Sequence, residues 1–230
     1  YPGESPIISG GKRITRWRET NVNGHRAWVA PIPAVKRGSW HFQQLWVNGE
    51  RRLRPRLPRE GLYRIERLVG VNKSTPYHHG QDQFVYAKGD LNPDWHNLQD
   101  VEVVALSYWT ESRMWIKETS RRQRLVVFDR KSSKRLTDDG DIGKPTEYYV
   151  ENIFEALEPG QWYLDRQEGK LFYLPLPGEE PDTAEVIAPR LTELVRVEGK
   201  KPVTQLHFEG IAFSHNHWDL PADQSNIGQA

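Results

Sequence analysis

Helical periodicity is almost absent from this chain of 230 residues, and its absence restricts the fold more than any other feature. Short runs rich in branched and aromatic residues alternate with Gly, Pro, Asn and Asp, which is the pattern of β-strands joined by turns. Only residues 150–157 have a helical pattern, with Asn152 as a cap and Pro159-Gly160 as a stop. The sequence therefore predicts an all-β fold.

Two hairpins stand out among the predicted strands. Asn48-Gly49 is a strong type I′ turn signal between residues 44–47 and 51–56. The alternation of Leu53 with Arg52 and Arg54 predicts a return strand whose basic face is solvated. The second hairpin joins residues 161–164 to 170–174, and Asp165 serves its turn, since Asp tolerates turn geometry. Further strands are predicted at 83–87, 101–109, 113–118 and 124–128.

The last part of the chain has a different pattern. Residues 194–199 and 205–215 alternate apolar with polar side chains, and each run meets a Gly before the chain turns. This succession of strand and Gly turn is typical of the coils of a parallel β-helix, in which each coil buries its inward residues on the next. One or two coils cannot bury a core alone, so neighbouring coils must come from the start of the chain or from outside it.

Composition and charge limit the classes of partner. The net charge of +1 argues against bulk attraction to nucleic acid or to a membrane, and no apolar run reaches the length of about 18 residues that a spanning helix needs. The chain has no cysteine and hence no disulfide framework. We interpret its abrupt ends as boundaries within a longer protein.

The charge is unevenly distributed along the chain. Residues 1–60 hold 12 Lys/Arg against 4 Asp/Glu, a balance of +8, and residues 147–198 hold 4 against 12, a balance of −8. The two segments could simply have differently charged solvated faces or dock on each other. The alternative interpretation is a basic groove for an acidic polymer such as a uronic-acid polysaccharide.

Six segments, taken together and in order, carry a resemblance to a known group of proteins. They are Tyr1–Gly11, Gln44–Arg51, Tyr148–Asn152, Gly160–Arg166, Leu171–Glu179 and Phe208–His215. In this order they resemble the right-handed parallel β-helix repeat proteins that include glycoside hydrolase families 141 and 120. The resemblance implies an early β-helix coil at 1–17, a β-sandwich-like insertion at 18–182, and resumed coils at 183–230.

The same resemblance implies a function. It points to a secreted or periplasmic bacterial glycoside hydrolase that acts on plant or algal cell-wall polysaccharide containing xylan or fucose. This chain would form scaffold and cleft wall, with the polysaccharide and the rest of its own β-helix chain as partners. The acidic catalytic pair would lie on later coils beyond Ala230, so no catalytic carboxylate is assigned here.

The stretch from Ser214 to Asp219 is the candidate binding site. His215 and His217 are two residues apart and would share one face of a strand, with Asp219 nearby. These side chains could hydrogen-bond sugar hydroxyls while Trp218 stacks on a pyranose ring, and the resemblance favours His215 and Trp218 as cleft residues. The competing interpretation is a polar coil corner with a packed Trp. A zinc site would need a third ligand at suitable spacing, so no metal is assigned.

Other polar clusters have simpler interpretations. The acidic run 138–141 could bind calcium through oxygen ligands, but it lacks the spaced ligands and final Glu of a calcium loop, so a solvated loop is the preferred reading and no cofactor is assigned. His78-His79 is interpreted as a surface pair. Asp223 joins Asp219 as the second acid expected near the cleft.

Two further functions remain open from the sequence. One is a non-catalytic carbohydrate-binding module, which would bind glycan through exposed aromatic residues. The other is a polysaccharide lyase on the same β-helix architecture, which would use a basic residue and often calcium. Fold alone does not choose among them.

Overall fold

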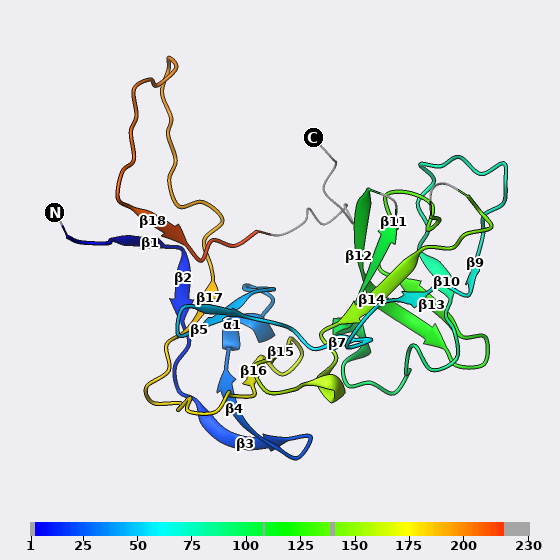
Figure 1. Ribbon diagram of the computed structural model, residues 1–230, viewed down its shortest axis with the longest axis horizontal. Coiled ribbons are helices and arrows are strands. Elements are labelled where there is room, and N and C mark those ends of the chain that lie inside the picture. The colour runs from blue at the N-terminus through cyan, green and yellow to red at the C-terminus, as the bar shows by residue number, and fades with distance from the viewer. Residues whose placement is uncertain (1–2, 108, 139–140, 219–230) are drawn as a thin grey trace.

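The structure, a computed structural model, describes residues 3–107, 109–138 and 141–218 and consists almost entirely of β-strands (Figure 1). The all-β prediction is therefore confirmed. Helices in the described residues are limited to α1 (Pro33–Lys36) and the 3-10 turns η1 (Leu98–Asp100) and η2 (Phe154–Ala156). The helix predicted at 150–157 is reduced to η2, because residues up to Glu151 extend as a strand.

Two four-stranded sheets form a β-sandwich. Buried residues of both sheets, among them Trp28, Leu45, Trp162 and Val186, belong to one hydrophobic cluster, so the sheets are the two layers of a sandwich. The first sheet has the order β15 (Trp162–Asp165), β16 (Lys170–Tyr173), β4 (His25–Pro31), β3 (Arg18–Val22). The second has the order β2 (Gly11–Arg13), β17 (Val186–Pro189), β5 (Leu45–Val47), β6 (Glu50–Arg52).

Both predicted hairpins are confirmed. β5 pairs with β6 through Val47 and Glu50, and the turn residues Asn48 and Gly49 have φ values of 52° and 80°, as a type I′ turn requires. In the β15–β16 hairpin, the backbone N–H of Glu168 donates to Oδ1 of Asp165, so Asp165 closes its turn as predicted.

The third sheet has eight strands and is curled around its own core. Its path is β7 (Arg56–Leu57), β14 (Glu147–Glu151), β11 (Glu102–Ser107), β12 (Thr110–Ser120), β13 (Leu125–Phe128), β10 (Gln83–Val85), β9 (Arg67–Leu68), with β8 (Tyr63–Arg64) also on β14. Phe84 of β10 and Tyr148 of β14 are four steps apart, which in a flat sheet would separate them by about 19 Å. Their rings lie 5.0 Å apart, so the sheet folds back on itself.

The last sheet pairs the two ends of the described chain. β1 (Ile7–Ser9) runs parallel to β18 (Ala212–Ser214) in the register Ile7 to Ala212. Between β17 and β18, residues 190–211 leave the sandwich as a long arm, which is drawn in orange in Figure 1.

The predicted parallel β-helix is not seen in the described residues. Parallel pairing there is limited to β1–β18 and the isolated bridge between Leu53 and Gln161. Of the strands expected at 194–199 and 205–215, only residues 212–214 form and pair, because no neighbouring strand in the described residues offers the rest hydrogen-bond partners. The division into segments at 17/18 and 182/183 stays a prediction. β2 lies before the first boundary and β17 lies after the second, and both strands join the sandwich.

Candidate functional site

A polar cavity of about 260 Å³, the Trp218 cavity, lies where the sandwich meets the curled sheet. Trp218 forms one wall, and half of its side chain (51%) is exposed. The remaining lining residues are almost all polar or charged: Gln43, Gln44, Arg51, Arg52, Leu53, Arg54, Glu111, Arg113 and Glu151. An exposed aromatic ring beside many hydrogen-bonding groups is therefore built into this wall of the molecule.

The chain leaving β6 positions the cavity. After the tight β5–β6 turn, the carbonyl of Leu53 accepts from the N–H of Trp162 in the sandwich, and the carbonyl of Pro55 accepts from the N–H of Asn152 beyond β14. These bonds tie residues 53–55 to both halves of the molecule. Arg54 consequently lies in the junction, where only 9% of its side chain is exposed.

A buried ion-pair network surrounds Arg54. Its guanidinium donates to the carboxylates of Glu102 and Glu151, and only 9% of the Arg54 side chain and 4% of the Glu102 side chain are exposed. Arg113 of β12 lies 3.2 Å from both carboxylates and 2.8 Å from Glu111. Two arginines and three carboxylates thus form one connected network beneath the cavity.

This arrangement corrects the prediction of a solvated basic face at 51–56. Leu53 is exposed (71%), whereas Arg52 and Arg54 are held in ion pairs with Glu179 and with the network. The alternation was interpreted correctly, but the faces are reversed, because most of the acidic partners lie far away along the chain, on β11, on β14 and in the loop after β16.

The network holds the carboxylate of Glu102 in the charged form. Burial tends to raise the pKa of Glu102, but the charges of Arg54 and Arg113 outweigh this and hold the pKa below its ordinary value. For Arg113, burial is likewise outweighed by Glu102, Glu151 and Glu111, so its pKa is raised. A glycosidase acid needs a raised pKa to donate a proton near neutral pH. Glu102 therefore serves to position the arginines and does not fit the role of a catalytic acid.

His215 is packed at the junction of β1 and β18. Its Nδ1 lies 2.9 Å from Oγ of Ser9, and its ring meets the ring of Trp46 edge-on at 4.9 Å. Burial lowers the pKa of His215, with a small opposing effect from Glu185. A Cβ on Gly11 would lie 2.9 Å from Cβ of His215 and 2.2 Å from Ile187, so glycine permits this close approach.

His217 has different neighbours from His215. β18 ends at Ser214 and His215 has a positive φ of 57°, so the strand geometry that would place both rings on one face is lost. The N–H of His217 donates to the carbonyl of Leu191, and its charge acts on His41. Of the predicted site, only Trp218 lines the cavity; Asp219 and Asp223 lie outside the described residues.

Sequence reasoning missed His41. Both of its ring nitrogens are buried without a hydrogen-bond partner in the described structure, and the ring meets Trp115 edge-on at 5.6 Å. Burial, and then the charges of Arg166, Arg54 and His217, lower the pKa of His41 to about 3. A His between Trp40 and Phe42 gave no local signal of this environment, which depends on Trp115 of β12 and on Arg166 in the β15–β16 turn.

The remaining polar clusters contribute no further site. His78 and His79 are exposed, as predicted. Across the described ranges, no group of three His, Cys, Asp or Glu side chains is arranged to hold a metal ion, and residues 139 and 140 of the acidic run lie outside those ranges. Nor does any described helix have the length and apolar character needed to cross a membrane.

Comparison with known families identifies the central part of the chain. Residues 25–176, about two thirds of the sequence, match the family described as the GH141 insertion domain. The chain belongs to the GH141 insertion domain family. The matched range includes the whole curled sheet and the β15–β16 hairpin of the sandwich. The grouping with glycoside hydrolase family 141 that the sequence motifs indicated is thereby confirmed.

One solved structure supports the same assignment. A chain described as "Glycoside hydrolase" aligns with this GH141 insertion domain protein with a TM-score of 0.73 and 26% sequence identity. The alignment covers 94% of this chain but 37% of the other, so the present chain spans well under half of the length of that relative. No curated protein sequence matches the chain.

Proposed function

We propose that this chain is a segment of a secreted glycoside hydrolase that degrades plant or algal cell-wall polysaccharide containing xylan or fucose. In this proposal the chain forms scaffold and one wall of the substrate cleft. The family membership and the glycoside hydrolase relative support a carbohydrate substrate. The catalytic carboxylates are proposed to lie outside these residues, since the relative is much longer and the buried Glu102 is held ionised.

The Trp218 cavity is the observation on which the cleft-wall role rests. Sugars present apolar ring faces and many hydroxyl groups, so their sites combine an aromatic surface with several hydrogen-bonding side chains. Trp218 is half exposed beside Gln43, Gln44 and Glu111. The ion-pair network beneath would hold Arg113 and Glu151 in fixed positions, so that little ordering is needed when a sugar binds.

We also propose that β1 and β18 are neighbouring coils of a right-handed parallel β-helix. These two strands come from opposite ends of the described chain and pair in parallel. Ile7, Ile8 and Phe213 remain exposed on them. The arm that leads to β18 exposes seven further large apolar side chains: Leu191, Val195, Val197, Val203, Leu206, Phe208 and Ile211. Further coils of the same protein would bury these residues, since a coil of a solenoid is completed by its neighbour.

A non-catalytic carbohydrate-binding module is the second candidate, because an exposed Trp beside polar side chains can bind a glycan without hydrolysing it. Both candidates predict glycan binding by this chain. They differ in whether the longer protein that contains it hydrolyses the bound glycan.

Binding and turnover by the 230-residue chain would be measured on xylo-oligosaccharides, pectic oligosaccharides and fucosylated oligosaccharides. Replacing Trp218 by Ala should weaken binding roughly tenfold through the loss of ring stacking. Trp109→Ala is the matched control, because Trp109 is also exposed (65%) but does not line the cavity. Unchanged binding by the Trp218 variant would refute the cleft-wall role, and turnover by this chain would refute the placement of the catalytic pair elsewhere.

A further inference from the structure

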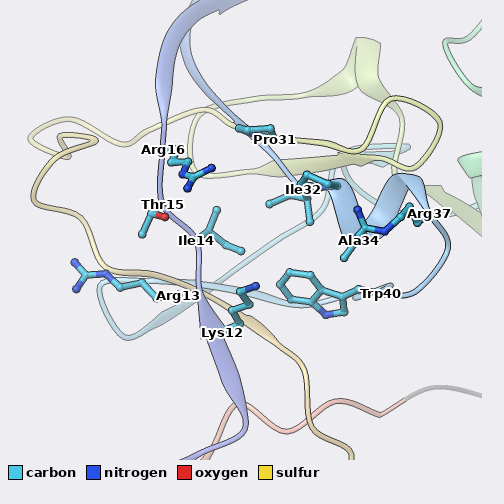
Figure 2. A pocket seen from close by; sticks show the side chains of 11 residues that line it. Lys12, Arg13, Ile14, Thr15, Arg16, Pro31, Ile32, Ala34, Arg37 and Trp40 are labelled. Atoms are coloured by element: carbon cyan, nitrogen blue, oxygen red, sulfur yellow. The ribbon is translucent and has the colours of Figure 1, made fainter.

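A second cavity, which we name the basic cavity, has a volume of about 480 Å³ and lies between the residues that follow β2 and the helix α1 (Figure 2). Four cationic side chains line it: Lys12, Arg13, Arg16 and Arg37. No acidic residue is in its lining. Figure 2 shows Lys12 and Arg16 extending toward the enclosed space, whereas Arg13 points outward. The basic cavity and the Trp218 cavity share no lining residue.

The charges of the basic cavity are uncompensated. Elsewhere in the chain arginines are usually paired with carboxylates, as Arg26 is with Glu19 and Glu180, and Arg124 with Glu66. Within the described residues, by contrast, Lys12, Arg13, Arg16 and Arg37 make no ion pair. A concave surface lined by one sign of charge attracts ions of the opposite sign.

The opposite side of the basic cavity is apolar and rigid. Trp40 is buried, and its Nε1–H donates to the carbonyl of Pro189 at 2.8 Å, which fixes the ring. Nζ of Lys12 lies 5.7 Å from the centre of this ring, and Ile32 is buried beside it. Cationic side chains around an aromatic and aliphatic surface suit a ligand that combines a sugar ring with a negative group.

Arg16 is held in an unfavourable backbone conformation at the edge of the basic cavity. Its φ is 64°, in the left-handed region that a residue with a Cβ rarely adopts. Asn23, Asn48, Asn97 and Asn152 also have positive φ, but Asn tolerates it. Arg124, another arginine in this conformation, pairs with Glu66, whereas Arg16 has no such partner in the described residues. Strained residues of this kind are concentrated at ligand-binding sites.

We propose that the basic cavity binds an anionic sugar residue of the polysaccharide through its carboxylate or sulfate group. Lys12, Arg16 and Arg37 would supply the charge-assisted hydrogen bonds, and Trp40 with Ile32 would contact the ring. This site rests on the proposed function in that its ligand is a glycan. It adds a preference for uronic-acid or sulfated chains at a place distinct from the Trp218 cavity.

The test compares three oligosaccharides by calorimetry: xylo-oligosaccharide bearing glucuronic acid, sulfated fuco-oligosaccharide, and unsubstituted xylo-oligosaccharide. The unmodified chain should bind one of the anionic ligands roughly tenfold more tightly than the neutral one in about 50 mM salt, and this preference should shrink in about 300 mM salt. The two anionic ligands distinguish carboxylate from sulfate as the recognised group.

The variant Arg16→Gln/Arg37→Gln should lose roughly tenfold in affinity for the anionic ligand. Both side chains are exposed, so the fold should be retained, and Lys12→Gln/Arg37→Gln provides a second variant. Lys73→Gln/Lys117→Gln removes the same charge from exposed positions that do not line the basic cavity.

Three results would overturn the proposed anionic site: equal affinity for neutral and anionic ligands, an equal loss in the control pair, or full binding by both cavity variants. Failure of the proposed function gives a different result. In that case binding of the neutral oligosaccharide would be unaffected by Trp218→Ala, while the loss of anionic binding in the Arg16/Arg37 variant would still be measured.

Discussion

Replacing Arg54 by Met would remove the central cation of the buried network while keeping an unbranched side chain of similar length. Glu102 and Glu151 would then share Arg113 as their remaining arginine in the network, which leaves one buried negative charge uncompensated. Removing one partner of a buried ion pair typically costs about 3–5 kcal/mol in the free energy of unfolding. We expect a loss of that size, because both Arg54 and Glu102 are almost fully buried.

The loss should depend on pH. In the unmodified chain the pKa of Glu102 is below its ordinary value, so its stabilising contribution is complete above that value and is lost as the pH falls through the folded pKa. Without Arg54, burial would raise the pKa of Glu102 instead. The variant would therefore be most destabilised near neutral pH, and its deficit should shrink as Glu102 takes up a proton in acid.

Urea unfolding followed by tryptophan fluorescence at two pH values would measure both effects. Arg64→Met is the matched control, since its ion pair with Glu147 is about half exposed and should contribute at most about 1 kcal/mol. Adding Glu102→Gln to Arg54→Met should recover part of the loss by removing the uncompensated charge. A loss near neutral pH no larger than that of the control would refute the burial and the pairing of the network.

Three further changes test other parts of the structure. Trp162 is fully buried and stacks on Phe42 at 5.6 Å, so Trp162→Ala should cost about 3–5 kcal/mol in urea unfolding; a cost below about 1 kcal/mol would contradict the aromatic core. Arg16→Gly should raise the free energy of unfolding by about 1 kcal/mol by relieving its positive φ, and a destabilised variant would refute the strain. Because the pKa of His41 is lowered to about 3, the unfolded chain binds a proton that the folded chain does not, so stability should fall by up to about 1.4 kcal/mol per pH unit as the pH drops below about 6. A folded-state NMR titration of His41 with a midpoint near its ordinary pKa would contradict that burial.

Local features of the fold could be predicted because they depend on residues close together in the chain. The Asn48-Gly49 turn could be predicted because Asn and Gly adopt positive φ easily. The turn role of Asp165 could be predicted because an Asp side chain accepts a hydrogen bond from the backbone close by in the chain, here from the N–H of Glu168. The strand predicted at 101–109 forms as β11, which has β14 on one side and β12 on the other.

The expected coils at 194–199 and 205–215 show the limit of such patterns. An alternating sequence indicates that a strand could form, but a strand needs a partner for its backbone groups. In the described structure β18 pairs with β1, more than 200 residues earlier in the chain. The arm before β18 has no strand to pair with and forms no strand itself.

The sequence alone determined that the chain is built of short strands and tight turns, and its motifs indicated the glycoside hydrolase 141 group. Only the tertiary structure decided which side chains meet. Arg54 is buried against Glu102 and Glu151, which lie 48 and 97 positions away in the chain. Trp218 lines a cavity to which three strands contribute. Turn and strand preferences are properties of neighbouring residues, whereas the burial of a charge depends on partners that only the folded chain brings together.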